Sequence, residues 1–267
     1  MGGTYSFTAS HRGGSGSPLV CLHGFMDTWR VWELVLPALE RRHDVLAVTL
    51  PGHAGGPRLG RDVSADTFVD AVEDLIEQAG FSVAHLVGSS LGGYIALRLA
   101  ARGRATTVVT FAPAGGWARD DHSSPEELLR AQRELHELMK ALAPQAPVLL
   151  ATPEGRRRAT RLITTNFEHI PSELLAHEML GIAACQGAQS LIESARRDGW
   201  ALDAQSVTCP VRIVWGNADK LLPWPEAAVR YRVEWLPHAD WVLLDGIGHC
   251  PHLDVPLEAA QLILDFA

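Results

Sequence analysis

The residues with the clearest chemical potential lie in the run Gly88-Ser89-Ser90-Leu91-Gly92, which follows an apolar stretch and precedes a segment with helical spacing. A G-x-S-x-G pattern between a strand and a helix is typical of a sharp turn that presents one serine as a nucleophile. Ser90 has a glycine two positions before it and two positions after it, whereas Ser89 has neither. We therefore predict that Ser90 is a nucleophile. The alternative is a small-residue turn that only packs a helix against a strand.

A second loop, His23-Gly24-Phe25, directly follows the apolar run Leu19–Leu22. When a nucleophile attacks a carbonyl carbon, negative charge develops on the oxygen, and backbone N–H groups can bind that oxyanion. We predict that these donors are the N–H groups of Phe25 and of Leu91, the residue after the nucleophile. We expect His23 to hydrogen-bond the backbone and assign it no role as acid or base.

A serine hydroxyl needs a neighbouring base to become a good nucleophile, and the chain contains 12 histidines. His249 follows the apolar run Trp241–Leu244 in a glycine-rich loop, so it should lie at the same sheet edge as the nucleophile. The nearest alternative, His252, lies beyond a proline, where we expect it to begin or cap the last helix. His238 precedes its strand and would emerge at the opposite edge. We therefore predict His249 as the base.

The base needs a carboxylate that holds its tautomer and stabilises the imidazolium. Asp219 directly follows the apolar run Val211–Trp215 and is the predicted acid. The preceding apolar run, Thr107–Phe111, has no acidic residue near its end, and Asp245 is too close in sequence to the base to reach its ring comfortably. The nucleophile, the acid and the base therefore occur in that order along the chain.

These side chains need a scaffold that brings their loops to one edge, and the apolar pattern predicts one. Six short, nearly continuous apolar runs are typical of strands buried on both faces of a parallel sheet. Segments with helical spacing lie between the first four of them, so an α/β architecture with a mostly parallel sheet is expected. The runs are Leu19–Leu22, Val45–Leu50, His85–Val87, Thr107–Phe111, Val211–Trp215 and Trp241–Leu244.

The alternation stops after the fourth run, and the pattern is then helical from about residue 120 to residue 204. The simplest organisation is an α/β core formed by residues 1–117 and 206–267, interrupted by a helical insertion at residues 118–205. The run Gly13–Ser17 is where we expect a hairpin turn before the first long strand. The candidate helices of the insertion are Glu126–Lys140, Gly155–Phe167 and Ser172–Arg197.

Taken together, these motifs closely resemble the α/β-hydrolase superfamily, over essentially the whole chain. The fourth and sixth residues of its Pro-Gly-x-Gly-x-Ser loop depart mildly from the pattern, because this chain has Pro51-Gly52-His53-Ala54-Gly55-Gly56 there. The resemblance implies an α/β-hydrolase fold whose inserted helices form a cap over the active site. The matching pieces are His23-Gly24-Phe25, Leu50-Pro51-Gly52-His53, Gly88-Ser89-Ser90-Leu91-Gly92-Gly93, Gly216-Asn217-Ala218-Asp219 and Gly248-His249.

The resemblance also narrows the chemistry. Ser90 at the nucleophile position excludes the branches that use aspartate there, which are the epoxide hydrolases and haloalkane dehalogenases. Esterases, lactonases, thioesterases, peptidases, cofactor-free haloperoxidases and carbon–carbon bond hydrolases remain. The His-Gly-Phe and Pro-Gly-His pieces are also similar to the menaquinone-pathway lyases, which eliminate pyruvate with the same triad.

We predict a serine hydrolase that cleaves a carboxylic ester, lactone or thioester through an acyl-enzyme on Ser90. The alternatives are carbon–carbon bond hydrolysis or lyase chemistry with the same triad, and a non-catalytic ligand receptor on the same fold. We expect no metal and no organic cofactor. Met26, Trp117 and Trp224 fall near loop ends at the catalytic edge, and they could line an apolar acyl pocket or equally belong to the core.

Composition limits the partners. The formal net charge of −8 disfavours nucleic acid and anionic membranes as partners, and no apolar run approaches the ~18 residues that span a bilayer. The four cysteines are scattered, so we expect no disulfide framework and a cytoplasmic location. The run Arg156-Arg157-Arg158 with Arg161 is interpreted as a solvated helix face. A small-molecule substrate is the expected partner, and the sequence leaves the oligomeric state open.

Overall fold

A seven-stranded sheet forms the centre of the protein, whose computed structural model describes residues 6–60 and 62–267. The strand order across the sheet is β1-β3-β2-β4-β5-β6-β7. β1 pairs antiparallel with β3, and every other neighbouring pair is parallel. The strands are β1 (Ser10–Gly14), β2 (Ser17–Leu22), β3 (His43–Val48), β4 (Ala84–Ser89), β5 (Ala105–Phe111), β6 (Val211–Gly216) and β7 (Asp240–Leu244).

The six apolar runs correspond to β2–β7, so the predicted mostly parallel α/β sheet is confirmed. The expected hairpin turn at Gly13–Ser17 is wrong, because β3 lies between β1 and β2 in the sheet. The glycine-rich connection instead passes over the start of β3. A Cβ on Gly14 or Gly16, both at positive φ, would overlap the backbone carbonyls of His43 or Arg42. The glycines therefore permit a close crossing of two chain segments.

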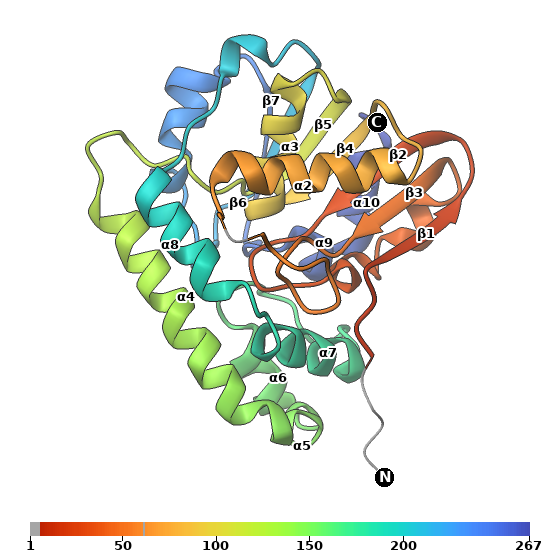
Figure 1. Ribbon diagram of the computed structural model, residues 1–267. Coiled ribbons are helices and arrows are strands. Elements are labelled where there is room, and N and C mark those ends of the chain that lie inside the picture. The colour runs from red at the N-terminus through yellow and green to blue at the C-terminus, as the bar shows by residue number, and fades with distance from the viewer. Residues whose placement is uncertain (1–5, 61) are drawn as a thin grey trace.

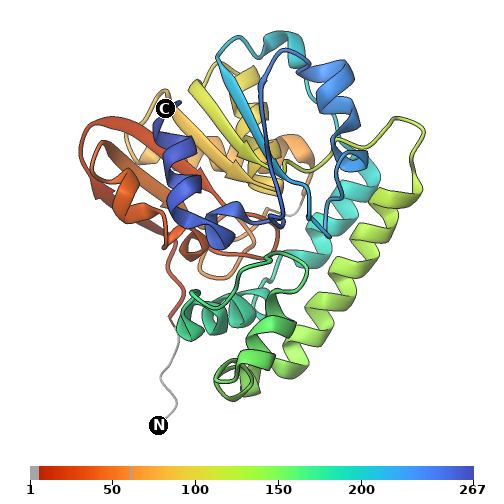
Figure 2. The same ribbon diagram turned by 180° about the vertical axis from the view of Figure 1, so that it is seen from behind.

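Helices cover both faces of the sheet (Figures 1 and 2). α2 (Ala65–Gln78) and α3 (Leu91–Ala101) pack on one face, and α1 (Leu36–Leu39), α9 (Pro251–Asp254) and α10 (Pro256–Leu264) pack on the other. α2 begins at a reciprocal capping box between Ser64 and Thr67. Its buried side chains Phe68, Val69, Val72 and Ile76 recur at helical spacing and join the core of the first face.

Five helices connect β5 to β6 and make up the inserted segment. Figure 1 shows them gathered along one side of the molecule, next to the sheet. Short 3-10 turns also occur at Trp29–Trp32, Ala143–Gln145, Ala204–Ser206 and Glu226–Ala228, and a π turn at Tyr231–Trp235. The inserted helices are α4 (Ser123–Leu142), α5 (Ala146–Leu150), α6 (Pro153–Thr160), α7 (Ser172–Ala183) and α8 (Ala188–Asp198).

Two predicted helices of the insertion end earlier than expected. The segment 172–197 forms two helices, because the chain turns where it meets the loop after β3. There the Gly187 N–H donates to the Gly52 carbonyl at 2.8 Å, and the Cys185 thiol lies 3.5 Å from the same oxygen. The segment 155–167 is helical only to Thr160, because its later residues bond to the C-terminal part of the chain. Contacts distant in sequence decide both boundaries.

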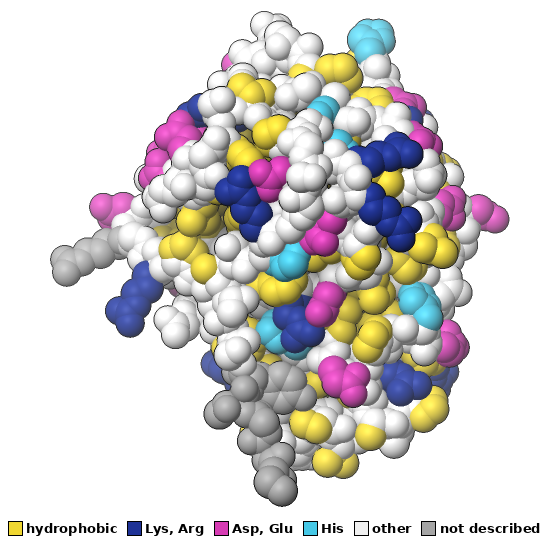
Figure 3. Space-filling view, turned by 90° about the vertical axis from the view of Figure 1, so that its right-hand side faces the viewer, with side chains coloured by type: hydrophobic (Ala, Val, Ile, Leu, Met, Phe, Trp, Pro, Cys, Tyr) yellow, Lys and Arg dark blue, Asp and Glu magenta, His cyan; other side chains and the backbone are white. Residues whose placement is uncertain are grey.

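Three further features of the described residues are the distribution of surface charge, the state of the cysteines and the character of the helices. Figure 3 shows basic and acidic side chains interspersed with apolar ones, without a single-sign patch covering that face. All four cysteines are free thiols, and Cys21, Cys185 and Cys250 are buried. Within the described residues, none of the helices has the length and apolar character that crossing a membrane requires.

Candidate active site

Ser90 occupies a strained turn between β4 and α3. Its backbone lies at φ 53° and ψ −115°, a region that residues with a side chain rarely adopt. The turn is held by the Ser90 N–H, which donates to the Phe111 carbonyl at 2.9 Å. A Cβ on Gly88 would overlap the Gly92 carbonyl, and a Cβ on Gly92 would overlap the Leu22 carbonyl. Both glycines are therefore required by the close approach of strand and helix.

The loop after β2 lies against this turn. A Cβ on Gly24 would lie 3.5 Å from the Ser90 Cβ. Among the described residues, the N–H groups of Phe25 and Leu91 have no acceptor, so both are available to an oxyanion. The next residue, Met26, has φ 63°, which shows how sharply the loop turns.

His23 supports this loop from beneath. One ring nitrogen, Nδ1, lies 2.7 Å from the Gly24 carbonyl, and the other, Nε2, accepts the Leu50 N–H at 2.9 Å. Burial lowers the pKa of His23 well below its usual range, with a further contribution from neighbouring His53. The expectation that His23 hydrogen-bonds the backbone is thus confirmed.

Asp219 and His249 form a buried pair at the ends of β6 and β7. The Asp219 Oδ2 lies 2.7 Å from the His249 Nδ1, and the two side chains are 0% and 3% exposed. The other carboxylate oxygen accepts the N–H groups of Leu221 and Leu222, each at 2.8 Å. These two bonds aim Oδ2 at the imidazole, an arrangement that holds the Nδ1–H tautomer and leaves Nε2 able to accept a proton.

The predicted nucleophile lies at the same edge of the sheet. Ser90 follows β4, and the loops that carry Asp219 and His249 follow β6 and β7, which run parallel to it. Ser90, Leu221 and Leu222 also line one cavity. Within the described residues, the Ser90 hydroxyl makes no hydrogen bond, to His249 or to any other group. Hydrogen bonds between a nucleophile and its base are often long before substrate binds. The structure therefore brings Asp219 and His249 into contact and has Ser90 at the same edge of the sheet.

His252, the alternative base, has surroundings unsuited to that role. Its ring is fully buried and stacks on Trp32 with 4.4 Å between ring centroids. Burial lowers its pKa to about 3, and neither ring nitrogen has a partner among the described residues. A group with so little proton affinity is a poor general base at neutral pH. It lies within α9 rather than in the last helix.

A cavity of about 810 Å³, counting the part that opens to solvent, adjoins Ser90. Its walls come from α2, α3, α4, α8 and the loop after Asp219, and most of the lining side chains are apolar. Leu91, Ile95, Leu129, Leu191, Ile192 and Trp200 are among them. A site of this size and character suits an apolar group on a small molecule.

None of the three predicted pocket residues lines this cavity. Met26 is buried in a small cluster with Cys185 and Ala188. Trp117 lines a separate depression beside Arg119, and Trp224 packs between the rings of Trp215 and Trp241. A position near a loop end does not indicate which way a side chain points. Each of these three side chains packs against other residues outside the cavity lining. Phe25 does line it, through its side chain next to the oxyanion loop.

The arginine run lies on an exposed helix surface. Arg157 and Arg158 are 65% and 78% exposed and pair with Glu154, as expected of a solvated helix face. Across residues 6–60 and 62–267, no three His, Cys, Asp or Glu side chains group in a way that would hold a metal ion.

One buried residue of this region was missed by the sequence analysis. Asp254 in α9 is 2% exposed, and its carboxylate accepts three backbone N–H groups. The donors are Thr165 at 3.0 Å, Asn166 at 2.5 Å and Gly248 at 2.7 Å. Asp254 thus ties the inserted segment to the residue before His249. An acidic residue in a short helix between two prolines was its only sequence signal.

Asp254→Asn should lower both stability and turnover. The amide would turn an NH₂ group toward backbone donors, leaving a buried N–H without an acceptor at a cost of about 1–3 kcal/mol. Displacement of the His249 loop should lower kcat roughly 10- to 100-fold with little change in KM. Thermal unfolding and steady-state kinetics measure the two effects. The exposed Asp265→Asn is the control, and equal kinetics for both variants would contradict the positioning role.

Comparison with known proteins places this architecture among hydrolases. The chain is 29% identical over 215 residues, 76% of its length, to the epoxide hydrolase EphH of Mycobacterium tuberculosis, covering 95% of that protein. It is 24% identical over 278 residues to the human monoacylglycerol lipase ABHD6, covering 98% of this chain and 79% of the lipase.

A solved structure is also similar in fold. The meta-cleavage product hydrolase CumD of Pseudomonas fluorescens superposes with a TM-score of 0.70 at 20% identity, over 98% of this chain and 96% of that one. The family model described as "alpha/beta hydrolase fold" matches residues 17–256, which include all strands but β1 and the whole insertion. The chain belongs to the α/β-hydrolase fold family.

Proposed function

We propose that this protein is a serine hydrolase that cleaves a carboxylic ester, thioester or lactone through an acyl-enzyme on Ser90. The observation that carries the proposal is the buried Asp219–His249 hydrogen bond, formed at the same sheet edge as a serine held in a strained turn. This combination supplies a nucleophile, a base and a group that orients the base.

The proposed hydrolysis uses Ser90, His249 and Asp219 in the following steps. His249 Nε2 removes the hydroxyl proton as the Ser90 oxygen attacks the carbonyl carbon. The N–H groups of Phe25 and Leu91 bind the oxyanion, and the imidazolium then protonates the leaving alcohol or thiol. Water, activated by the same imidazole, attacks the acyl-enzyme and releases the acid. Asp219 keeps its negative charge throughout and stabilises the imidazolium.

The cavity supports an ester with an apolar acyl group. No Lys, Arg or His is among the described residues that line it, so an anionic substrate would be buried there without a counter-charge. This favours a neutral ester over the elimination of an anionic product such as pyruvate. We propose that residues 118–205 act as a cap, because α4 and α8 of this segment supply part of the cavity wall.

The similarity to an epoxide hydrolase does not change the proposed reaction. Epoxide hydrolases of this fold use an aspartate as nucleophile, whose ester intermediate water then hydrolyses. Here Ser90 stands at that position. An alkyl ether formed by serine attack on an epoxide would have no carbonyl for water to attack, so turnover would stop after one cycle.

A panel of p-nitrophenyl esters tests the proposal. Burying each added methylene in the cavity should contribute about 0.8 kcal/mol, so kcat/KM should rise roughly fourfold per methylene from acetate to hexanoate. A fluorophosphonate probe should label Ser90. If the folded protein hydrolyses no ester, thioester or lactone and resists the probe, the proposal is wrong. Turnover of a vinylogous diketone alone would favour carbon–carbon bond hydrolysis.

A further inference from the structure

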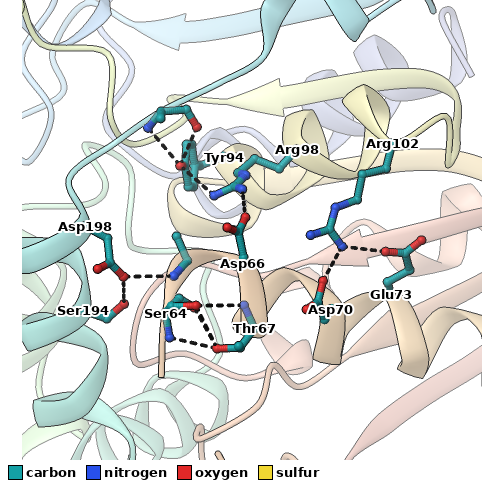
Figure 4. A network of polar contacts seen from close by, with 12 residues as sticks. Ser64, Asp66, Thr67, Asp70, Glu73, Tyr94, Arg98, Arg102, Ser194 and Asp198 are labelled. Carbon is teal, nitrogen blue, oxygen red and sulfur yellow. Dashed lines mark hydrogen bonds and ion pairs between the residues drawn. The ribbon is translucent and has the colours of Figure 1, made fainter. Parts of the chain in front are cut away.

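The cavity beside Ser90 has few polar side chains, and three of them are already paired within the protein. The Ser64 hydroxyl accepts the Thr67 N–H at 3.1 Å. The Tyr94 hydroxyl donates to the Ala201 carbonyl at 2.8 Å and accepts the Ala201 N–H at 3.2 Å. The Ser194 hydroxyl donates to Asp198 at 2.9 Å. Figure 4 shows these contacts, which direct each polar group to a partner in the protein.

Gln132, on the cap side of the cavity, is not paired in this way. It lies on α4, is 9% exposed and lines the cavity together with Leu128 and Leu129. Within the described part of the chain, its side-chain amide has no hydrogen-bond partner. A primary amide has two donors and an acceptor oxygen, and the Gln132 amide atoms are not fully enclosed by protein, so they can pair with a bound molecule. The Ser90 hydroxyl and the Trp200 indole N–H are also unpaired among the described residues of the lining, but the indole can only donate.

We infer that Gln132 binds a neutral oxygen-bearing group on the acyl part of the substrate, so that the substrate class is esters of oxo- or hydroxy-substituted acyl chains. This inference rests on the proposed function. The amide can donate to a ketone oxygen or accept from a hydroxyl group. A carboxylate is disfavoured, because no Lys, Arg or His is among the described residues of the lining.

A hydrogen bond between the Gln132 amide and the acyl chain would make the enzyme select among acyl groups. A plain acyl chain of equal length fills the cavity but leaves the Gln132 amide unpaired, whereas a chain with a correctly placed oxygen pairs it. A site that hydrogen-bonds its substrate discriminates against the analogue that lacks the partner. Gln132 belongs to the insertion, whereas Ser90, Asp219 and His249 belong to the core. Specificity and chemistry are therefore assigned to separate parts of the chain.

Paired substrates test the inference. Pentanoate, hexanoate and heptanoate p-nitrophenyl esters are compared with their 4-oxo, 5-oxo and 6-oxo counterparts. In the unmodified protein, at least one oxo ester should exceed its plain partner in kcat/KM by roughly tenfold. In Gln132→Leu that ratio should fall to about one. The exposed Gln145→Leu, outside the cavity lining, should keep the original ratio.

The outcomes separate this inference from the proposed function. If every ester is hydrolysed and the oxo-to-plain ratios are the same with and without Gln132, Gln132 is a structural residue and the inference is overturned. If the unmodified protein hydrolyses none of the esters, the proposed function itself is wrong, and the assignment falls with it. Should Gln132→Leu fail to fold, Gln132→Met provides the same comparison with a side chain of similar length.

Discussion

Replacing Ser90 with alanine should lower kcat for an ester substrate by roughly 10⁵- to 10⁶-fold and abolish labelling by a fluorophosphonate probe. The variant removes only the hydroxyl oxygen. Alanine carries the same Cβ as serine, so the strained backbone at φ 53° is no less favourable in the variant than in the original. We therefore expect the melting temperature to change little, and a loss of activity reports chemistry rather than unfolding.

The neighbouring serine gives a matched control. Ser89 is 1% exposed and ends β4, one residue before the turn. Because only Ser90 has the required glycine at both flanking positions, Ser89→Ala should retain activity within several-fold and should still be labelled. Persistent labelling and turnover in Ser90→Ala would overturn the nucleophile assignment. Loss of both only in Ser89→Ala would show that the reading frame of the motif is wrong.

Replacing Asp219 with asparagine should lower kcat by roughly 10⁴-fold through the tautomer of His249. One carboxylate oxygen accepts the N–H groups of Leu221 and Leu222. An asparagine keeps its oxygen on these donors, and its NH₂ group then faces the imidazole Nδ1. Nδ1 must act as an acceptor, which moves the ring proton to Nε2. A protonated Nε2 cannot remove the proton from Ser90.

Kinetics and unfolding measurements together check this expectation. Asp219→Asn should bind substrate with nearly unchanged affinity and retain the fold, while kcat falls. The control is Asp245→Asn, because Asp245 lies in the same loop region but bonds the Asn217 side chain at 2.8 Å instead of the base. Near-normal kcat in Asp219→Asn would show that another group orients His249. A large loss in Asp245→Asn would identify it as the acid instead.

Local patterns were sufficient for much of the scaffold. β2–β6 are largely buried, so their sequences are nearly continuous apolar runs that can be recognised without the fold. β7 keeps such a run although it lies at the sheet edge and is mostly half-buried or exposed. β1 was missed because its sequence, Ser-His-Arg-Gly-Gly, has no such run and its side chains are exposed or half-buried. Its pairing with β3 depends on backbone bonds at the sheet edge, to which the side-chain pattern gives no clue.

The inserted helices show that helical spacing of apolar residues does not by itself predict where a helix ends. Residues 172–197 keep a helical pattern throughout, yet the helix breaks where Gly187 meets Gly52. The same limit applies to cavity residues. Met26, Trp117 and Trp224 were predicted from loop position, but only packing decides whether a side chain turns toward the cavity or toward the core.

The sequence by itself determined the α/β architecture, the candidate nucleophile Ser90 and the loops that carry Asp219 and His249. These features depend on glycine spacing and strand ends, which are local. Three features depend on the folded chain: the buried hydrogen bond between Asp219 and His249, the contact of Asp254 with the inserted segment and the His249 loop, and the place of Gln132 in the cavity lining. Burial and pairing depend on neighbours far apart along the chain, and no local pattern records them.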